Sequence, residues 1–223
     1  MHYKIHGIDI PTELSALPIN RANQIVLAEL KKIIANYTQP TILDYGCGKL
    51  RHSYFLLNQG LSVCGVDSIE QITRIQKINK QKTSLTNWSK KLDNLTIYSV
   101  EDFSKKEQFF DIAICTNVLS AIPFDHDIIF LLDNIYKHLT NSGRLFLSVQ
   151  YKNSYFDSYK TKGNANFYNG GWIINNKSKN SYYRLIQPAL LRNMCIKSHF
   201  VIENEIKKQG SIYLTLIKNN CSL

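Results

Sequence analysis

The chain has 223 residues, of which 44% are hydrophobic and 20% charged, and this balance excludes a disordered or fibrous protein. No apolar run approaches the roughly 20 residues that a membrane span needs, and the N-terminus lacks the apolar segment of a secretory signal. From these two absences we predict that the protein has no membrane partner. Its five cysteines form no C-x-x-C pair, so we also predict that it has no metal site and that it is a reduced, cytoplasmic protein.

The net charge of +10 is unevenly distributed along the chain. Residues 1–150 carry 16 Lys and Arg against 14 Asp and Glu, whereas residues 151–223 carry 11 against 3. A composition rich in lysine would by itself spread the charge evenly. The asymmetry therefore favours an anionic partner for the C-terminal third of the chain.

Strands and helices alternate over most of the sequence. Residues 1–19 are short and mixed, and a helix is predicted from about 20 to 36, so that 1–39 form an N-terminal helical segment. Strands are then expected near 41–44, 62–67, 95–100, 110–116 and 144–150, with helices near 51–59, 69–82 and 126–139. Such alternation predicts a parallel sheet covered by helices on both faces.

The alternation stops at residues 151–183, which are rich in Asn, Ser, Lys, Gly and Tyr without a clear period. We interpret residues 151–185 as an insertion, or lid, on the rim of the domain. A helix over 187–194 and a hairpin of strands 200–206 and 212–218 follow, with the turn at Gln209 and Gly210. The chain is thus predicted to be one α/β domain with a core at 40–150 and a C-terminal helix and hairpin at 186–223.

The most informative stretch, residues 41–51, runs from an apolar segment into Asp44 and then turns at Gly46 and Gly48. A second apolar segment ends at Asp67, 19 residues after Gly48. Glycines let the backbone approach a ligand, and the N-terminus of the next helix favours an anion. An acid at the end of the second strand can accept two hydrogen bonds from a ribose diol. The pattern therefore predicts a nucleoside site.

Arg51 occupies the third glycine position of a dinucleotide fingerprint, which disfavours NAD or FAD. Residues 40–150 instead resemble the class I S-adenosylmethionine-dependent methyltransferases in four ordered motifs. These motifs are Asp44-Tyr-Gly-Cys-Gly48, Gly65-Val-Asp67-Ser-Ile-Glu70, Phe110-Asp-Ile-Ala-Ile-Cys-Thr-Asn117-Val-Leu-Ser-Ala-Ile-Pro123 and Asn141-Ser-Gly143-Arg-Leu-Phe-Leu147. The resemblance implies a doubly wound, mostly parallel seven-stranded sheet with a C-terminal antiparallel hairpin, and S-adenosylmethionine as cofactor.

The resemblance also implies roles for single residues. Asp44 would bind the amino group of the methionine part of the cofactor, directly or through water, and Asp67 would hold the ribose. Ser68 and Ile69 would lie beside the adenine, with Val100 and Glu101 at its border, and Asn117 would lie near the methyl group. The implied cofactor-binding residues are Asp44, Gly46, Cys47, Gly48, Asp67, Ser68, Ile69, Val100, Glu101 and Asn117. Two positions depart from the family pattern, because Leu50 replaces a glycine and Ser99 replaces an acid.

The catalytic residue stays unknown, because methyl transfer from a sulfonium needs positioning and desolvation more than a base. Asn117 and His126 are the candidates. His126 lies between two carboxylates and could act as a base, but Asp125 capping the next helix, with His126 solvated in its first turn, is the more ordinary interpretation. His52 is expected on the exposed face of the first helix after the glycine turn.

The insertion carries the signal for the methyl acceptor. It holds 9 of the chain's 25 aromatic residues, namely Tyr151, Tyr155, Phe156, Tyr159, Phe167, Tyr168, Trp172, Tyr182 and Tyr183. Five lysines are interleaved with them, namely Lys152, Lys160, Lys162, Lys177 and Lys179, and only Asp157 opposes them. Aromatic residues can stack on a base while lysines meet phosphates, but a lid packed by its own aromatics explains the pattern equally well.

We therefore predict a methyltransferase acting on an O or N atom of an anionic or base-containing acceptor, with nucleic acid or a nucleotide favoured. Tyr168, Trp172 and Arg184 are the predicted recognition residues. A small-molecule methyltransferase is one alternative. A cofactor-binding but inactive subunit that positions a protein partner is another, and the oligomeric state is open.

Overall fold

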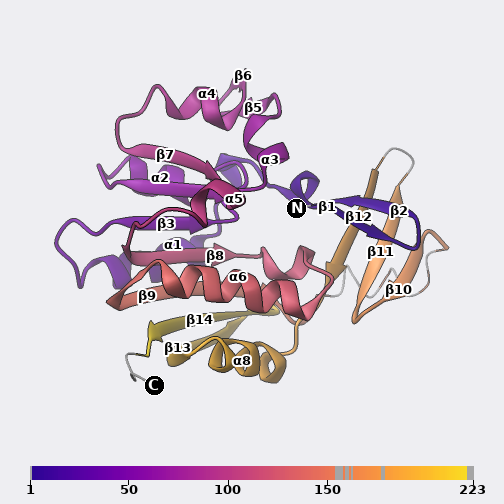
Figure 1. Cartoon of the computed structure of the whole chain (residues 1–223). Coiled ribbons are helices and arrows are strands. Elements are labelled where there is room, and N and C mark those ends of the chain that lie inside the picture. Colours follow the sequence, from indigo (N-terminus) through magenta and orange to yellow (C-terminus); the bar gives the residue numbers. More distant parts are fainter. Residues whose placement is uncertain (1, 154–157, 159–160, 162, 177–178, 220–223) are drawn as a thin grey trace. The chain divides into compact units, whose positions relative to one another are not determined.

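The computed structural model describes residues 2–153, 158, 161, 163–176 and 179–219, and the chain divides into two compact units. Unit 1 comprises residues 1–15, 116–137 and 145–223, and unit 2 comprises residues 16–115 and 138–144. Figure 1 labels their helices and strands. The division of the chain at residues 39, 150 and 185 stays a prediction.

A seven-stranded sheet with the order β13-β14-β9-β8-β3-β4-β7 confirms the predicted architecture. Its strands are β3 Ile42–Tyr45, β4 Val63–Asp67, β7 Leu95–Ser99, β8 Phe110–Thr116, β9 Leu139–Gln150, β13 Phe200–Lys208 and β14 Ser211–Lys218. The pairs β3–β4, β3–β8 and β4–β7 are parallel, and β13–β14 is antiparallel. The chain order reverses beside β3, and open α/β sheets bind their ligands at such a switch point.

The helices of unit 2 begin at side chains that cap them. These helices are α1 Gln24–Ile34, α2 Ser53–Leu57, α3 Ile69–Thr73, α4 Leu85–Ser89 and α5 Val100–Phe103, preceded by the short η2 Ile19–Arg21. Asn23, Ser68, Ser84 and Ser99 each accept a hydrogen bond from a backbone N–H in the first turn that follows. Because these side chains satisfy donors that a helix leaves unpaired, they fix where four of the five helices start.

The structure differs from the predicted helix over residues 69–82. The helix α3 ends at Thr73, and an antiparallel hairpin of β5 Gln76–Ile78 and β6 Gln81–Thr83 follows. Asn79 (φ +41°) and Lys80 (φ +69°) form its two-residue turn in the left-handed conformation. Ile78 is fully buried, so the apolar residue that suggested a longer helix instead anchors a strand.

Unit 1 contains two elements that the sequence pattern did not indicate. Residues 2–11, expected in a helical segment, form a hairpin of β1 His2–Ile5 and β2 Ile8–Pro11, followed by η1 Thr12–Ser15. The insertion, expected to be irregular, forms a three-stranded antiparallel sheet of β10 Ala165–Tyr168, β11 Gly171–Asn176 and β12 Lys179–Arg184. The remaining elements of this unit are η3 Leu119–Ala121, α6 Asp125–Lys137 and α8 Pro188–Lys197.

The β1–β2 hairpin packs against β12 within unit 1 (Figure 1). Ile5 and Ile10 of the hairpin share a buried apolar cluster with Ile173 and Tyr182 of the small sheet. The Asn180 side chain donates a hydrogen bond from Nδ2 to the backbone oxygen of Asp9 at 3.2 Å. A two-stranded hairpin such as β1–β2 is at best marginally stable alone, and the shared cluster removes an apolar face of the hairpin and of the small sheet from water.

The strand β9 begins at Leu139, earlier than predicted, so the segment 141–143 lies within the strand rather than in a turn before it. Gly143 is required there for space, because a β-carbon would come within 3.0 Å of the Thr140 backbone oxygen and 3.1 Å of Leu139. Gly143 therefore permits close packing inside a strand.

Candidate cofactor-binding site

The turn after β3 is fixed to the end of β4 by backbone hydrogen bonds. Gly46 (φ +77°) and Gly48 (φ +57°) both take the left-handed conformation that glycine adopts without a steric penalty. The N–H groups of Gly46 and Cys47 donate to the Val66 oxygen at 2.7 and 3.1 Å. The N–H of Gly48 donates to Asp67 Oδ2 at 2.8 Å. The glycine turn and the acid of the second strand are therefore in direct contact.

Small residues leave space around this turn. A β-carbon at Gly48 would lie 3.3 Å from the β-carbon of Ala16, and one at Gly65 would lie 2.7 Å from Ile97 Cδ1 and 3.2 Å from Cys47 Sγ. Burial raises the pKa of the Cys47 thiol well above its usual value, so this side chain packs as an apolar group. Ala16 was not predictable, because one small residue in a mixed segment carries no pattern.

Asp67 has the capacity to bind a diol. Its Oδ2 accepts the Gly48 N–H, and its Oδ1 accepts the Ser68 N–H at 2.8 Å. Burial raises the pKa of this carboxyl group, and the two backbone hydrogen bonds oppose that effect. A carboxylate offers about four acceptor positions, so two remain for hydroxyl donors such as those of a ribose. The residues present thus fit the nucleoside part of the predicted cofactor.

Asp44 is a buried acid that receives a hydrogen bond from the Ser53 hydroxyl at the start of α2. Its pKa is raised to about 6, mainly by burial and also by the charge of Asp67, while the Ser53 hydrogen bond and the charge of Arg51 oppose this rise. At neutral pH the group is an ionised carboxylate with few partners. Such a group attracts a cation, and an amino group close to the glycine turn meets this requirement.

Two of the residues expected beside an adenine begin the helix α3. The Ser68 hydroxyl accepts the Gln71 N–H at 3.3 Å, so its side chain caps the helix. Ile69 is 46% exposed directly after this cap and offers an apolar surface one residue from Ser68. The position of Ile69 suits contact with a purine, whereas the Ser68 side chain already has a structural partner.

The other two, Val100 and Glu101, form the first turn of α5. The β4–β7 register places Asp67 opposite Ser99, so α3 and α5 start at neighbouring positions. Ser99 accepts the Asp102 N–H at 3.0 Å and donates to Asp102 Oδ2 at 2.8 Å. Where the family carries an acid, this chain therefore has a serine whose side chain caps α5 together with Asp102.

Leu50 and His52 show how the first motif deviates from its expected form. Leu50 keeps the left-handed backbone of the glycine it replaces, with φ +62°, although this conformation costs roughly 1–2 kcal/mol for a residue with a side chain. Its complete burial offsets that cost by about 1.5–3 kcal/mol. The expected exposure of His52 is wrong, because His52 is buried, its Nε2 accepts the Asn23 N–H at 3.4 Å, and burial lowers its pKa to about 3.

The candidates for a catalytic group, Asn117 and His126, both belong to unit 1. Asn117 has a left-handed backbone (φ +59°) and donates its N–H to the Ser148 oxygen at 2.8 Å. His126 stacks on Phe124, with ring centroids 5.4 Å apart, and its Nε2 lies 3.3 Å from Asp127 Oδ1. The His126 side chain is 78% exposed, which agrees with a solvated residue in the first turn of α6.

The predicted acceptor residues lie on two faces of the small sheet. Tyr168 pairs with Gly171 across β10–β11, and Gly171 pairs with Arg184 across β11–β12, so Tyr168 and Arg184 share one face. Trp172 points to the opposite face, where it forms an edge contact with Phe167 at 5.2 Å between ring centroids. Tyr168 and Arg184 therefore share one face of the small sheet, with Gly171 between them, and Trp172 lies on the other face.

Part of the aromatic set packs within unit 1. Tyr168 makes edge contacts with His6 and Phe124 at 5.3 and 6.3 Å, and Tyr182 belongs to the buried cluster beneath the β1–β2 hairpin. Phe167, in contrast, is 66% exposed. Several residues of the predicted acceptor surface lie outside the described part of the chain, namely Tyr155, Phe156, Tyr159, Lys160, Lys162 and Lys177.

Arg184 is buried but only partly satisfied. Its Nη1 lies 2.7 Å from Asp125 Oδ1 at the start of α6, so Asp125 pairs with this arginine. The Nε and Nη2 atoms of Arg184 are buried and have no hydrogen-bond partner among the described residues. The Tyr182 hydroxyl also lies near this guanidinium, but at a geometry too poor for a normal hydrogen bond to Nε or Nη2, and buried polar groups are almost always paired, so this edge of Arg184 requires an explanation.

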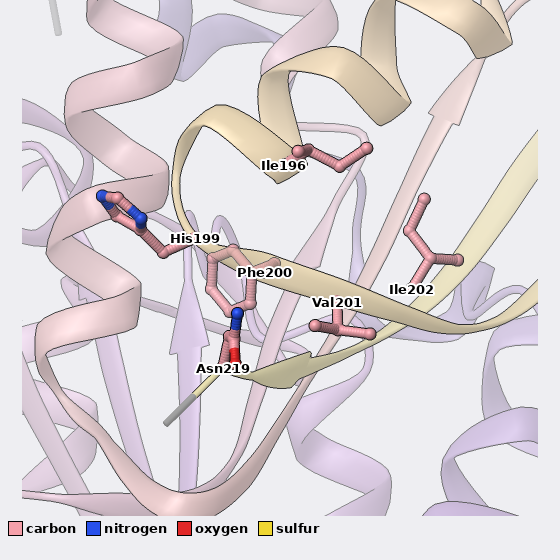
Figure 2. Close-up of a pocket in the computed structure, with 6 residues that line it drawn as sticks. All are labelled: Ile196, His199, Phe200, Val201, Ile202 and Asn219. Atoms are coloured by element: carbon pink, nitrogen blue, oxygen red, sulfur yellow. The ribbon is translucent and has the colours of Figure 1, made fainter. Parts of the chain in front are cut away.

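An open groove in unit 1 is formed by the end of α8 and the start of β13 (Figure 2). It is lined by Ile196, His199, Phe200, Val201, Ile202 and Asn219. The lining is mostly apolar, and it contains none of the residues predicted to bind a cofactor or an acceptor.

A family model described as a methyltransferase domain matches residues 18–195. The uncharacterized protein YmfD of Escherichia coli (strain K12) is 31% identical over 217 residues, which are 97% of this chain and 96% of that protein. A solved S-adenosylmethionine-dependent methyltransferase of Clostridium acetobutylicum has a TM-score of 0.63 at 13% identity, covering 87% of this chain and 90% of its own. The solved 1,6-didemethyltoxoflavin-N1-methyltransferase of Burkholderia thailandensis has a TM-score of 0.59 at 16% identity, and the match covers 88% of this chain and 78% of that one.

The family match spans most of the chain, so the protein belongs to the S-adenosylmethionine-dependent methyltransferases, as the four motifs predicted. It is an enzyme with the class I fold and with S-adenosylmethionine as its methyl donor. In the part of the chain that the structure describes, no helix is both long and apolar enough to cross a membrane.

Proposed function

We propose that the glycine turn and the acids beside it form the cofactor site of this methyltransferase. Asp67 would hold the ribose hydroxyls with its two unused acceptor positions, and Asp44 would attract the amino group of the methionine part. Ile69 would contact the adenine, with Val100 and Glu101 at its border and Asn117 near the methyl group. The contact between Gly48 and Asp67 supports this assignment, because it joins two motifs that lie 19 residues apart.

S-adenosylmethionine supplies a methyl group that is already activated by its positive sulfur. The residues of this chain then have to orient the cofactor, orient the acceptor and keep water away. We propose that the acceptor is an anionic or base-containing molecule methylated on an O or N atom, with nucleic acid or a nucleotide as the favoured class. The four described cysteines are free, which supports a reduced, cytoplasmic setting.

The observation that carries the proposed acceptor class is the unsatisfied edge of Arg184. Each buried donor without a partner costs about 1–3 kcal/mol, so an arginine with two of them is expected to have a ligand. Nε and Nη2 lie on the same edge of the guanidinium, which matches the two oxygens of a phosphate or a carboxylate. Tyr168 lies on the same face of the small sheet, two strands from Arg184, with its ring packed against His6 and Phe124.

A small-molecule acceptor is the second candidate. One guanidinium edge binds a single carboxylate as well as it binds one phosphate of a nucleotide. The Burkholderia thailandensis protein was solved with bound 1,6-didemethyltoxoflavin, a small molecule. An inactive, cofactor-binding subunit is the third candidate, and it would show cofactor binding without turnover on any acceptor.

Methyl transfer from radiolabelled S-adenosylmethionine to RNA, DNA, free nucleotides and aromatic carboxylates tests the proposal. We expect incorporation into one anionic class, with an acceptor KM at least about tenfold higher for Arg184→Lys, because lysine keeps the charge but loses the planar edge. No incorporation into any anionic acceptor, or an unchanged KM in Arg184→Lys, would contradict it.

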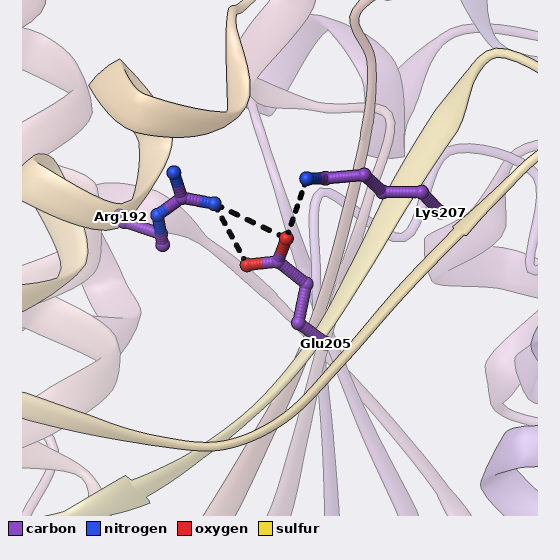
Figure 3. Close-up of polar contacts among 3 residues, drawn as sticks. All are labelled: Arg192, Glu205 and Lys207. Carbon is purple, nitrogen blue, oxygen red and sulfur yellow. Dashed lines mark hydrogen bonds and ion pairs between the residues drawn. The ribbon is translucent and has the colours of Figure 1, made fainter.

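Arg192→Lys is the matched control, because Arg192 already has a partner. Its Nη1 lies 3.1 and 3.0 Å from the two carboxylate oxygens of Glu205, which also accepts from Lys207 at 3.0 Å (Figure 3). Burial raises the pKa of Glu205, but the hydrogen bonds from Lys207 and Arg192 lower it by more. We expect Arg192→Lys to leave the acceptor KM unchanged.

A further inference from the structure

The segment 71–92 of unit 2 has an unusually one-sided charge. It contains six basic residues, namely Arg74, Lys77, Lys80, Lys82, Lys90 and Lys91, and no acidic residue. The rest of residues 1–150 carries 10 basic and 14 acidic residues, so the small excess of positive charge in that part of the chain comes from this segment alone. The segment contains the β5–β6 hairpin, which the sequence pattern suggested to be helix.

One buried side chain and two hydrogen bonds attach the hairpin to the rest of unit 2, and its lysine side chains are exposed to solvent. Ile78 is fully buried, the Gln76 Nε2 donates to the Gln71 oxygen at 2.9 Å, and the Asn79 Nδ2 donates to the Tyr54 hydroxyl at 2.9 Å. The side chains of Lys77, Lys80 and Lys82 are exposed. The exposed Lys77 lies between the buried Gln76 and Ile78, so these contacts hold the hairpin in place while its lysines stay in solvent.

This arrangement places like charges side by side. Lys77 and Lys82 are direct partners across the two strands, and like charges in that position destabilise a sheet. Lys80 occupies the turn between them with φ +69°, a conformation that favours glycine or asparagine. Neither feature helps the hairpin to fold, and a polyanion bound across the lysines would remove the repulsion.

The hairpin is also connected to the cofactor site of the same unit. The Gln71 Nε2 donates to the Gly48 oxygen and lies 3.2 Å from Gln76 Oε1, so one side chain joins the glycine turn to β5. Burial lowers the pKa of Lys49, and the nearby charge of Arg74 lowers it further. Lys49 of the glycine turn therefore lies close enough to Arg74 for their charges to interact, and Arg74 lies just before the hairpin in the sequence.

We propose that Lys77, Lys80 and Lys82 of the β5–β6 hairpin bind the phosphate backbone of a polynucleotide and dock it beside the cofactor turn. This inference rests on the proposed anionic acceptor and narrows it, because a row of cations suits repeated phosphates rather than one free nucleotide. Contacts of this kind supply affinity and position without reading the sequence of the nucleic acid.

Fluorescence anisotropy with labelled single-stranded RNA and DNA tests the inference on the full chain. We compare wild type with the triple variant Lys77→Gln, Lys80→Gln, Lys82→Gln over a series of salt concentrations. The logarithm of the binding constant decreases with the logarithm of the salt concentration, and each lost phosphate contact makes this slope less steep by about 0.7–0.9. The slope of the hairpin variant should therefore be less steep by about 2–3. The triple variant Lys105→Gln, Lys137→Gln, Lys197→Gln removes the same charge from exposed positions elsewhere and should reduce the slope by less than one.

Three results would overturn the inference: no binding of either polymer by wild type at low salt, equal slopes in the two triple variants, or stronger binding of phosphatidylserine vesicles than of RNA or DNA. Calorimetry with S-adenosylhomocysteine should give one affinity for all three proteins, which shows that the hairpin variant remains folded.

Polymer binding that depends on the hairpin without methyl transfer would contradict the proposed function alone. Methyl transfer to a small acceptor with equal slopes would contradict this inference alone.

Discussion

Asp44 places an ionisable carboxyl group inside unit 2, where burial raises its pKa to about 6 from an ordinary value of 3.8. Because the folded-state pKa is the higher one, the folded protein keeps the proton between these values while the unfolded chain loses it. Ionisation of Asp44 therefore lowers the stability of the ligand-free fold as pH rises through this window. The carboxylate is retained at that cost, which agrees with a role in binding a cation.

Asp44→Asn should accordingly stabilise the ligand-free protein at pH 8. The pKa difference corresponds to about 3 kcal/mol at most, since one unit is worth about 1.4 kcal/mol. The gain should shrink towards zero near pH 4, where the folded wild type holds the proton. Urea unfolding at the two pH values measures it, with the exposed Asp93→Asn as control. A variant no more stable than wild type at pH 8 would contradict the assigned burial cost.

Single residues of the site were predictable where local physics fixes them. Gly46, Gly48 and Asp67 could be placed together, because a glycine turn and the next parallel strand must meet at one edge of a sheet. Ala16 and the buried position of His52 could not, because both depend on segments that approach from elsewhere in unit 2. Leu50 was noticed as a deviation, but its left-handed backbone was not foreseeable from an ordinary apolar residue.

At the scale of whole elements, hairpins could be predicted only where the strands beside the turn have a clear alternation of residues. Of the four two-residue turns made of described residues, three have glycine in second place, namely His6-Gly7, Asn169-Gly170 and Gln209-Gly210. Only the last was predicted, because its flanking residues alternate clearly. Asn169 and Gly170 form a strong turn signal that deserved more weight than the missing period around them. Asn79 and Lys80 form a turn without glycine, so the β5–β6 hairpin was mistaken for the continuation of a helix.

The small sheet of unit 1 depends on the absence of a side chain at Gly171. A β-carbon there would lie 2.6 Å from the Tyr182 ring and 2.7 Å from the Arg184 β-carbon. We expect Gly171→Ala to destabilise the protein by about 1–3 kcal/mol, as overpacking does, and to weaken acceptor binding by displacing Arg184. Gly163→Ala is the control, because its β-carbon would meet nothing within 4 Å.

Urea unfolding of both alanine variants measures the difference. Equal stability of Gly171→Ala and Gly163→Ala would contradict the tight packing around Arg184. A destabilised Gly171→Ala variant with an unchanged acceptor KM would instead separate the packing of the sheet from the proposed role of Arg184.

Across the whole molecule, positive charge is concentrated in two segments. Residues 71–92 contribute +6 and residues 151–223 contribute +8, so the remaining residues carry −4 in total. The net charge of residues 1–150 does not reveal the first segment, because acidic residues elsewhere in that part of the chain compensate for its positive charge. Both proposals for the acceptor depend on this distribution, which favours anionic partners of each basic segment.

The class of the fold was predictable from four motifs, because each motif describes a strand end whose chemistry is local. The accessory elements were not, since the β1–β2 hairpin packs on the small sheet through a shared cluster whose two contributing segments are more than 150 residues apart in the sequence. Long-range packing of this kind leaves no period in either segment alone.

Calorimetry with S-adenosylhomocysteine on wild type and Asp67→Asn addresses the cofactor site most directly. Asparagine keeps the shape of the side chain and can still accept the Gly48 N–H, but it removes the charge that strengthens hydrogen bonds to the ribose. We expect wild type to bind one equivalent, Asp93→Asn to bind equally well, and Asp67→Asn to bind at least about tenfold more weakly. A folded Asp67→Asn protein with the wild-type affinity would show that the acid at the end of β4 does not hold the nucleoside.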